Sequence, residues 1–268
     1  MGISFTVLSS GSTGNATVVR NEDTTIMIDA GLSAKRIEEL LQERELSGGD
    51  LDGILVTHEH SDHIKGLGAV ARKYSLPVYA NEKTWAAMAK SIGSIEDENR
   101  RILETGATME FGSLRVESFG ISHDAAEPVG YNFYDGPEKL SVATDLGYVS
   151  DKVKQAISKA DVLVLEANHD VEMLRMGRYP WNIKRRILSD IGHLSNEMAG
   201  AILSELLDGY TKRTYLAHLS RDHNMMELAK MTVRGAMEDR GCFYKDSEFR
   251  LCDTYYDRPT PWDKVSEP

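Results

Sequence analysis

A short segment rich in histidine, Thr57-His58-Glu59-His60-Ser61-Asp62-His63, constrains this chain more than any other feature. It directly follows the apolar run Gly53-Ile54-Leu55-Val56, which is typical of a buried strand. Side chains along a strand repeat their direction every two residues, so His58 and His60 point to the same side. Asp62 and His63 follow where the chain turns into a helix, and they approach from another direction. This arrangement suits two adjacent metal ions, and imidazole and carboxylate groups are suited to Zn²⁺, Mn²⁺ or Fe²⁺.

Three more potential ligands occur later in the chain, each just past an apolar run that resembles a strand. They are His123, Asp145 and His218. Any one of them alone is better explained as a polar residue at a strand end, and the first segment alone could be a solvated loop. Together they favour a metal site, because sites built on sheets commonly use side chains at strand ends.

The hydrophobic pattern predicts an α/β fold. Of the 268 residues, 41% are hydrophobic, which is enough for one large domain or two small ones. Strands are predicted over residues 4–9, 16–20, 24–29, 54–57, 77–80, 162–166 and 214–217, with further strands between 108 and 144 and a hairpin at Asp135-Gly136-Pro137. Helices are predicted over residues 34–44, 65–74, 82–92, 151–159, 196–207 and 225–240.

The net charge of −11 argues against nonspecific binding of nucleic acid over the whole surface. The most concentrated basic stretch, residues 175–186, contains Arg175, Arg178, Lys184, Arg185 and Arg186, with Tyr179 and Trp181 among them. Its cations could follow a phosphate backbone while an aromatic ring stacks on an unpaired base, but a solvated helix with a buried Trp is an equal alternative. The chain has neither the basic start of a signal peptide nor a run near the roughly 20 apolar residues that span a bilayer, so we expect a cytoplasmic protein with no membrane partner.

The HxHxDH pattern with the three later residues resembles the signature of the metallo-β-lactamase superfamily. That resemblance implies one domain over residues 1–268, a four-layer αββα sandwich in which helices flank two mixed sheets. It implies that His58, His60 and His123 hold a first metal ion, and that Asp62, His63 and His218 hold a second, with Asp145 bridging them. Asp29, which ends Ile26-Met-Ile-Asp29, matches an aspartate beneath the site, although a plain turn residue is equally consistent with the sequence.

Four segments resemble the nucleases of this superfamily, particularly those similar to ribonuclease Z. They are Pro128-Val-Gly130-Tyr131 after His123, Leu165-Glu166-Ala167, Gly192-His193-Leu194-Ser195 at a helix start, and Leu216-Ala-His218-Leu-Ser220. The resemblance implies that His193 contacts the scissile phosphate or protonates the leaving oxygen and that Glu166 orients it. Together with Asp62, these are the expected catalytic residues. The helix start also suits a phosphate, but His193 could be structural and Glu166 could cap a strand. His169 is open between substrate contact and loop support, and His223 is expected to be a solvated loop residue.

Over its whole length the chain resembles the bacterial YycJ group, also called WalJ. The shared segments include the loop Ser10-Gly-Ser-Thr-Gly-Asn15 and Leu165-Glu-Ala-Asn-His-Asp170. This resemblance implies a 5′→3′ exonuclease linked to DNA repair, with two Zn²⁺ or Mn²⁺ ions and a metal-bound hydroxide as nucleophile. The chain lacks room for a β-CASP insertion and has no Gly-Pro-rich arm, which favours DNA over RNA. The alternatives are a small-molecule hydrolase of a thioester, lactone or cyclic nucleotide, and a regulatory protein without turnover; the oligomeric state is not indicated.

Overall fold

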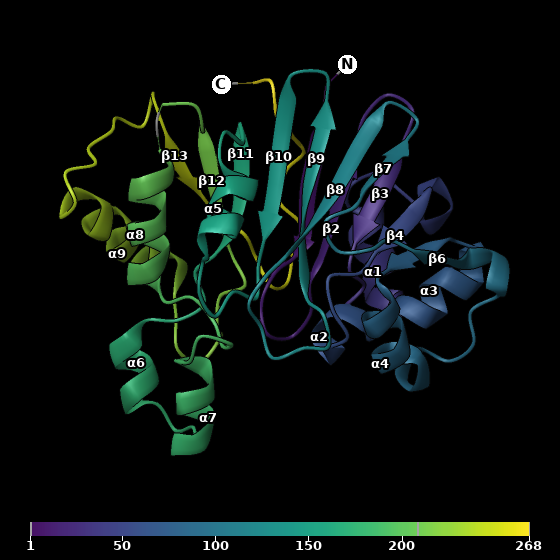
Figure 1. Ribbon diagram of the computed structural model, residues 1–268, viewed down its shortest axis with the longest axis horizontal. Coiled ribbons are helices and arrows are strands. Elements are labelled where there is room, and N and C mark those ends of the chain that lie inside the picture. The colour runs from purple at the N-terminus through teal and green to yellow at the C-terminus, as the bar shows by residue number, and fades with distance from the viewer. Residues whose placement is uncertain (1, 208, 268) are drawn as a thin grey trace.

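The apolar runs form two sheets that pack face to face, each with seven strands within residues 2–207 and 209–267, the part of the chain that the computed structural model describes (Figure 1). The first sheet has the order β14-β1-β2-β3-β4-β5-β6 and the second has the order β13-β12-β11-β10-β9-β8-β7. Both are mixed: β1 to β3 and β7 to β10 pair antiparallel, whereas β3 to β6 and β10 to β13 pair parallel.

The first sheet contains β1 (Ser4–Ser9), β2 (Ala16–Arg20), β3 (Thr25–Ile28), β4 (Gly53–Leu55), β5 (Val78–Ala80), β6 (Arg100–Ile102) and β14 (Asp263–Lys264). The second contains β7 (Thr108–Phe111), β8 (Leu114–Gly120), β9 (Val129–Asp135), β10 (Glu138–Ala143), β11 (Val162–Glu166), β12 (Arg213–Ala217) and β13 (Arg250–Cys252).

Strand β3 illustrates why the molecule has four layers. Ile26 and Ile28 lie between the sheets in a cluster that includes Phe133 of the second sheet. Met27 points the opposite way, as the two-residue period of a strand requires, and packs in a cluster with Leu40 of the neighbouring helix layer. Since both faces of the strand are buried, helices must cover the outside of the sheet.

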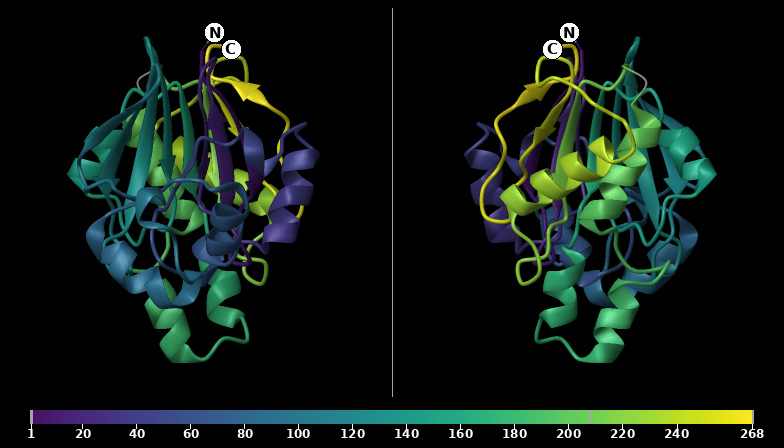
Figure 2. Two further views of the ribbon diagram at one scale, coloured as in Figure 1. Left: turned by 90° about the vertical axis from the view of Figure 1, so that its right-hand side faces the viewer. Right: turned by 90° about the vertical axis from the view of Figure 1, so that its left-hand side faces the viewer.

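Helices cover both outer faces (Figure 2). Those beside the first sheet include α1 (Ala34–Gln42), α3 (Leu67–Tyr74) and α4 (Glu82–Ile92), and those beside the second are α5 (Asp151–Ile157), α8 (Asn196–Leu206) and α9 (Met226–Glu238). The predicted αββα sandwich is therefore confirmed. None of the described helices combines the length and the apolarity that a bilayer crossing needs.

The remaining helices lie mostly at one end of the sandwich. They are α2 (Ser61–Ile64), α6 (Val171–Met176) and α7 (Trp181–Ile187), together with the short 3₁₀ turns η1 (Gly48–Asp50) and η2 (Asp97–Asn99). Figures 1 and 2 both show α6 and α7 projecting beyond the strand ends. The helix predicted over residues 65–74 begins two residues later, at Leu67, with Gly66 as its N-cap. Gly66 packs closely against the preceding loop, since a Cβ atom there would lie 2.2 Å from the Leu32 carbonyl oxygen.

The same end of the sandwich receives several strand ends that carry candidate ligands. Strands β3 and β4 are parallel, as are β10, β11 and β12, and β8 runs with β10 because both pair antiparallel with β9. The predicted site residues lie at the last position of these strands or in the segments that follow them, and they are Asp29, 58–63, His123, Asp145, Glu166 and His218. The topology therefore brings Asp29 and His218, which are 189 positions apart in sequence, to one edge.

Candidate metal centre

The backbone around the centre is closely packed and locally strained. Within residues 2–207 and 209–267, six non-glycine residues have positive φ, and Asp29, Asp145 and His218 are three of them, with φ between 57° and 61°. This conformation costs about 1–3 kcal/mol per residue, and such residues cluster at functional sites. At Gly31, an added Cβ would lie 1.6 Å from the Asp62 carbonyl oxygen, so only glycine allows the loop after β3 to support the histidine segment.

His58, His60 and His123 form the first cluster. His58 Nε2 lies 3.1 Å from His60 Nδ1, and His123 Nε2 lies 3.2 Å from the same atom. His123 Nδ1 donates to the Gly192 carbonyl oxygen at 3.0 Å, and since a carbonyl oxygen only accepts, the proton is on Nδ1. The Nε2 atom of a neutral His123 therefore presents a lone pair to the cluster, which is the form that binds a metal.

Thr57 and Asp29 fix two more imidazoles in the same way. The Thr57 hydroxyl donates to Asp29 Oδ2 at 2.8 Å and can then accept from His58 Nδ1 at 3.0 Å. His63 Nδ1 donates to Asp29 Oδ2 at 2.7 Å. Both histidines consequently direct Nε2 inward, and Asp29 supports the site instead of being a plain turn residue. The sequence reasoning missed Thr57, although it opens the histidine segment.

Asp62, His63 and His218 form the second cluster. Asp62 Oδ2 lies 3.6 Å from His63 Nε2 and 3.5 Å from His218 Nε2. His218 Nδ1 donates outward to Glu166 Oε1 at 2.8 Å. The potential ligand atoms of this cluster, like those of the first, all lie within 4.8 Å of one another.

Asp145 lies between the two clusters. Its Oδ2 is 3.3 Å from His63 Nε2 in the second cluster, and its Oδ1 is 3.7 Å from His123 Nε2 in the first. The carboxylate is 2% exposed, and its Oδ2 has no hydrogen-bond partner among the described residues. A buried oxygen without a partner is costly, and it fits a group that a bound cation would satisfy. The His218 Nε2 atom is buried without a partner in the same way.

The electrostatics of the centre also fit cations. Burial alone would lower the pKa of His63, but the Asp145 and Asp29 carboxylates outweigh it and raise that pKa to about 9. Burial would raise the pKa of Asp62, but the neighbouring imidazoles of His218 and His63 lower it well below its usual value. The carboxylates thus stabilise positive charge in the centre. In the metal-free protein protons on the histidines supply this charge, and bound divalent ions would replace them. The two histidine–aspartate clusters are therefore consistent with a dinuclear metal site.

Glu166 connects His218 to His193. The carboxylate is fully buried at the end of β11 and accepts four hydrogen bonds: from Nδ1 of His193 and of His218, and from the backbone N–H groups of Leu146 and Leu194. Burial opposes ionisation, but both histidines lower the pKa of Glu166 far enough to keep it charged. The predicted contact between Glu166 and His193 is present, and it leaves Nε2 as the ring nitrogen of His193 that can meet a ligand.

His193 borders both clusters, with its ring centroid 5.0 Å from that of His123 and 5.2 Å from that of His218. The start of α8 does not add the expected phosphate site. The N–H of Asn196 donates to the His169 carbonyl oxygen and that of Met198 to the Ser195 hydroxyl, and Ser195 and Asn196 are buried.

The two remaining histidines, His169 and His223, are buried in loops. His169 is buried; its ring meets the Asn168 side chain at 3.3 Å, and burial lowers its pKa to about 4. The prediction that His223 is solvated is wrong, since it is 2% exposed and its ring lies 4.5 Å from that of Tyr179. The loop after β12 folds back onto α6, which buries His223 against Gly177.

Basic residues also reach the rim of the centre. Arg186 on α7 forms a bidentate ion pair with Asp124, whose Oδ1 lies 3.5 Å from His123 Nε2 and 4.0 Å from His60 Nε2. The sequence analysis did not single out Asp124, although it directly follows a candidate ligand. The alternative of a buried Trp in this stretch is wrong, because Trp181 is 58% exposed.

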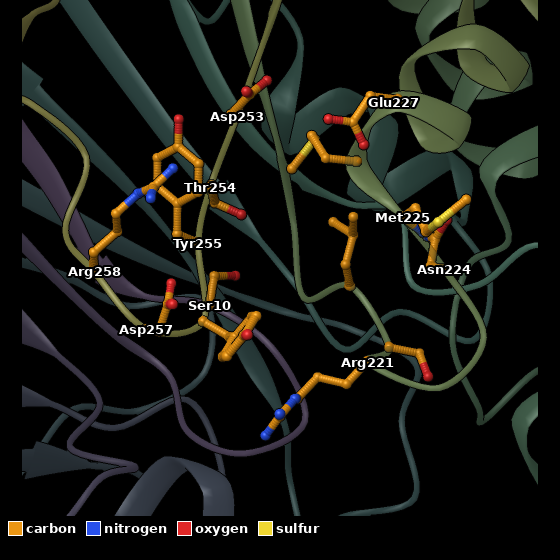
Figure 3. Close-up of a pocket in the computed structure, with 14 residues that line it drawn as sticks. Ser10, Arg221, Asn224, Met225, Glu227, Asp253, Thr254, Tyr255, Asp257 and Arg258 are labelled. Carbon is orange, nitrogen blue, oxygen red and sulfur yellow. The ribbon is translucent and has the colours of Figure 1, made fainter.

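A separate pocket of about 520 Å³ lies beside the loop that carries His218 (Figure 3). Figure 3 shows Tyr255 and Arg258 on one side of it and Asn224 and Glu227 on the other. Its link to the centre is Ser10, whose Oγ accepts the backbone N–H of His218 at 2.7 Å. None of the candidate ligands lines this pocket, so it is distinct from the metal centre.

A family model described as the beta-lactamase superfamily domain matches residues 24–219, which contain all seven candidate ligands. This chain belongs to the metallo-β-lactamase superfamily. It also belongs to the YycJ/WalJ family within it. The chain is 54% identical to exodeoxyribonuclease YycJ of Bacillus anthracis, over 97% of this chain and 98% of that protein. It is 45% identical to exodeoxyribonuclease WalJ of Streptococcus pneumoniae strain R6, over 99% of each. The resemblance drawn from the motifs is confirmed.

Solved structures agree on the fold of this metallo-β-lactamase superfamily member. YhfI from Bacillus subtilis has a TM-score of 0.72 at 14% identity and covers 97% of this chain and 99% of its own. The short form of human tRNase Z has a TM-score of 0.61 at 18% identity, with 81% of this chain and 93% of its own covered.

Proposed function

We propose that this protein is a DNA exonuclease that depends on two divalent metal ions and degrades DNA from the 5′ end. The observation that carries the proposal is the position of Asp145 between two histidine clusters, with His193 beside both. The choice of DNA is supported by the two relatives named exodeoxyribonuclease, which match over nearly the whole chain. Two bound ions, Zn²⁺ or Mn²⁺, would lower the pKa of a water molecule and hold phosphoryl oxygens.

The proposed ligands divide as the clusters do. His58, His60 and His123 would hold one ion, Asp62, His63 and His218 would hold the other, and Asp145 lies where it could serve both. Protein acceptors engage the outer ring nitrogens of His58, His63, His123 and His218, so these four imidazoles are fixed in orientation before an ion binds.

His193 is the proposed residue for the leaving group. Glu166 accepts its Nδ1–H at 2.8 Å, so the ring cannot rotate freely and Nε2 is the atom that meets the phosphate. A protonated Nε2 can donate to a phosphoryl oxygen or to the leaving oxygen. Glu166 acts through His193 and His218, and it is therefore a positioning residue.

The finer parts of the proposal follow from the family resemblance. They are the 5′→3′ direction, the preference for DNA over RNA, a role in DNA repair, and a cytoplasmic location. The repair role predicts more spontaneous mutations in cells without the protein, and rescue by the wild type but not by the Asp62→Ala variant. Equal mutation frequencies in the two strains would contradict that role.

The direct test is digestion of duplex and single-stranded DNA labelled at the 5′ or 3′ end, with Mn²⁺ or Zn²⁺, beside the Asp62→Ala variant. We expect metal-dependent release of the 5′ label as mononucleotide by the wild type alone. Release of the 3′ label first would show that the enzyme degrades DNA from the 3′ end and would contradict the proposed direction. No cleavage by protein shown to contain two ions would refute the nuclease and favour a small-molecule hydrolase.

A further inference from the structure

Helices α6 and α7 and the turn between them, here called the α6–α7 hairpin (residues 171–188), expose an unusual set of side chains. Met176 is 83% exposed and Trp181 is 58% exposed, and Tyr179 and Leu188 are each more than one-third exposed. The hairpin projects past the strand ends, on the side of the molecule that holds the metal centre (Figure 1). Large apolar side chains gathered on one projection are typical of a binding surface.

The charge of the hairpin differs from that of the rest of the chain. The hairpin contains five Lys or Arg residues and a single acidic residue, Glu172, which pairs with Arg175 at 2.9 Å, whereas the whole chain has a net charge of −11. A concentrated basic surface on an acidic protein points to a polyanionic ligand that is bound locally.

One of the five cations has a structural role. Lys184 is 7% exposed, and its Nζ donates to the carbonyl oxygens of Arg175 at 2.6 Å and Gly177 at 2.7 Å. These bonds join α7 to the end of α6 and fix the turn that precedes Trp181. Tyr179 holds the same turn from outside, because its hydroxyl donates to Asp222 at 3.0 Å. The exposed Trp and Arg side chains therefore stand on an ordered support.

The hairpin is continuous with the metal centre through Arg186. This residue is paired with Asp124, which in turn lies beside His123 and His60. A chain of phosphates that follows the exposed arginines of α7 toward Arg186 therefore ends at the first metal cluster.

We propose that the α6–α7 hairpin is a binding arm for single-stranded DNA. Trp181 stacks on an unpaired base, Arg178 and Arg185 contact phosphates, and Arg186 binds the phosphate nearest the metal centre. This inference rests on the proposed nuclease function and adds the path of the strand. Single-stranded DNA is favoured over duplex, because an exposed indole can stack only on a base whose face is open.

The test is fluorescence anisotropy of a labelled single-stranded oligonucleotide with the full chain, in chelator so that no cleavage occurs. Trp181→Ala should weaken binding about 5- to 140-fold, which is the usual range for loss of one base–aromatic stack. Trp181→Phe should restore most of the affinity and Trp181→Leu should not. Phe243→Ala is the matched control, because Phe243 is 76% exposed on the segment between α9 and β13 and should not change binding.

The arginines are tested by salt dependence. The double variant Arg178→Ala, Arg185→Ala should reduce the slope of log affinity against log salt by about 1.4, since each lost contact with single-stranded DNA contributes about 0.7. Arg240→Ala is the control for losing a positive charge outside the hairpin; Arg240 lies just beyond α9, donates to the Ala236 carbonyl oxygen, and its loss should leave the slope unchanged.

Other outcomes would overturn the arm. Wild-type affinity in Trp181→Ala, with loss in Tyr256→Ala instead, would place the strand in the pocket of Figure 3. A wild-type dimer that Trp181→Ala dissociates, seen by sedimentation, would make the hairpin a contact between two copies. If the wild type cleaves DNA and the Trp181→Ala variant binds DNA as tightly as the wild type does, the binding arm is refuted but the nuclease function is not. Failure of the wild type to cleave DNA refutes the proposed function itself.

Discussion

Replacing Glu166 with Gln is the most revealing single change, because this buried carboxylate accepts four hydrogen bonds and offers none. The amide has one oxygen and one NH₂ group. If its oxygen faces His193 and His218, its NH₂ group meets the N–H groups of Leu146 and Leu194. If it turns round, its NH₂ group faces the two imidazoles. Either orientation loses two hydrogen bonds and sets donors against donors.

The expected size of the effect follows from these contacts. A hydrogen bond to a charged group contributes about 1.5–3 kcal/mol, so the loss of two should lower the free energy of unfolding by about 3–6 kcal/mol. Metal affinity should fall as well, because His218 loses the anion that holds its Nδ1 proton. Loss of such a partner usually weakens metal binding about 10- to 100-fold.

Chemical denaturation in chelator measures the first quantity, and competition with a zinc indicator measures the second. Asp161→Asn is the matched control, because Asp161 directly precedes β11 and Glu166 is its last residue. The Oδ2 atom of Asp161 accepts a hydrogen bond from the backbone N–H of Lys139 at 2.8 Å. That variant should keep wild-type zinc affinity. A Glu166→Gln protein with wild-type stability and wild-type zinc affinity would refute the proposed role of this carboxylate.

Four further predictions concern the centre. Asp145→Ala should lose bound metal as well as activity, and unchanged metal content by elemental analysis would remove Asp145 from the bridging position. His193→Ala should keep both ions but lower turnover about 10²- to 10⁴-fold, so full activity would exclude His193 from the mechanism. Asp29→Asn should weaken zinc binding about 10- to 100-fold, because His63 loses its anionic partner; equal affinity in the indicator competition would contradict this. Chelator should lower the melting temperature, since an ion at 100 times its Kd stabilises the fold by about 2.7 kcal/mol, and no shift would mean that the fold holds no ion.

The inner strands and the candidate ligands could be predicted because their signals are local. Each candidate ligand follows an apolar run, and a strand end is visible in the sequence itself. Edge strands carry no such signal: β6 (Arg100–Ile102) is exposed at all its residues, and β14 has only two. The short helices α6 and α7 were not among the predicted elements, since few of their residues are buried.

The hydrogen bonds that orient the imidazoles could not be predicted, because their partners are distant in sequence. His123 uses the carbonyl oxygen of Gly192, 69 positions away, and His218 uses Glu166, 52 positions away. The burial of His223 likewise depends on Gly177 and Tyr179 of the α6–α7 hairpin. The sequence shows which residues can be metal ligands. Tertiary packing determines which ring nitrogen of each histidine faces the centre.

The most direct test of the central claim is to titrate the metal-free protein with Mn²⁺ or Zn²⁺ while measuring both bound ions and mononucleotide release from DNA. The two clusters joined by Asp145 predict little release without metal and a maximal rate when about two ions are bound per chain. A maximal rate with one bound ion, or in chelator with protein shown to be metal-free, would contradict a dinuclear nuclease.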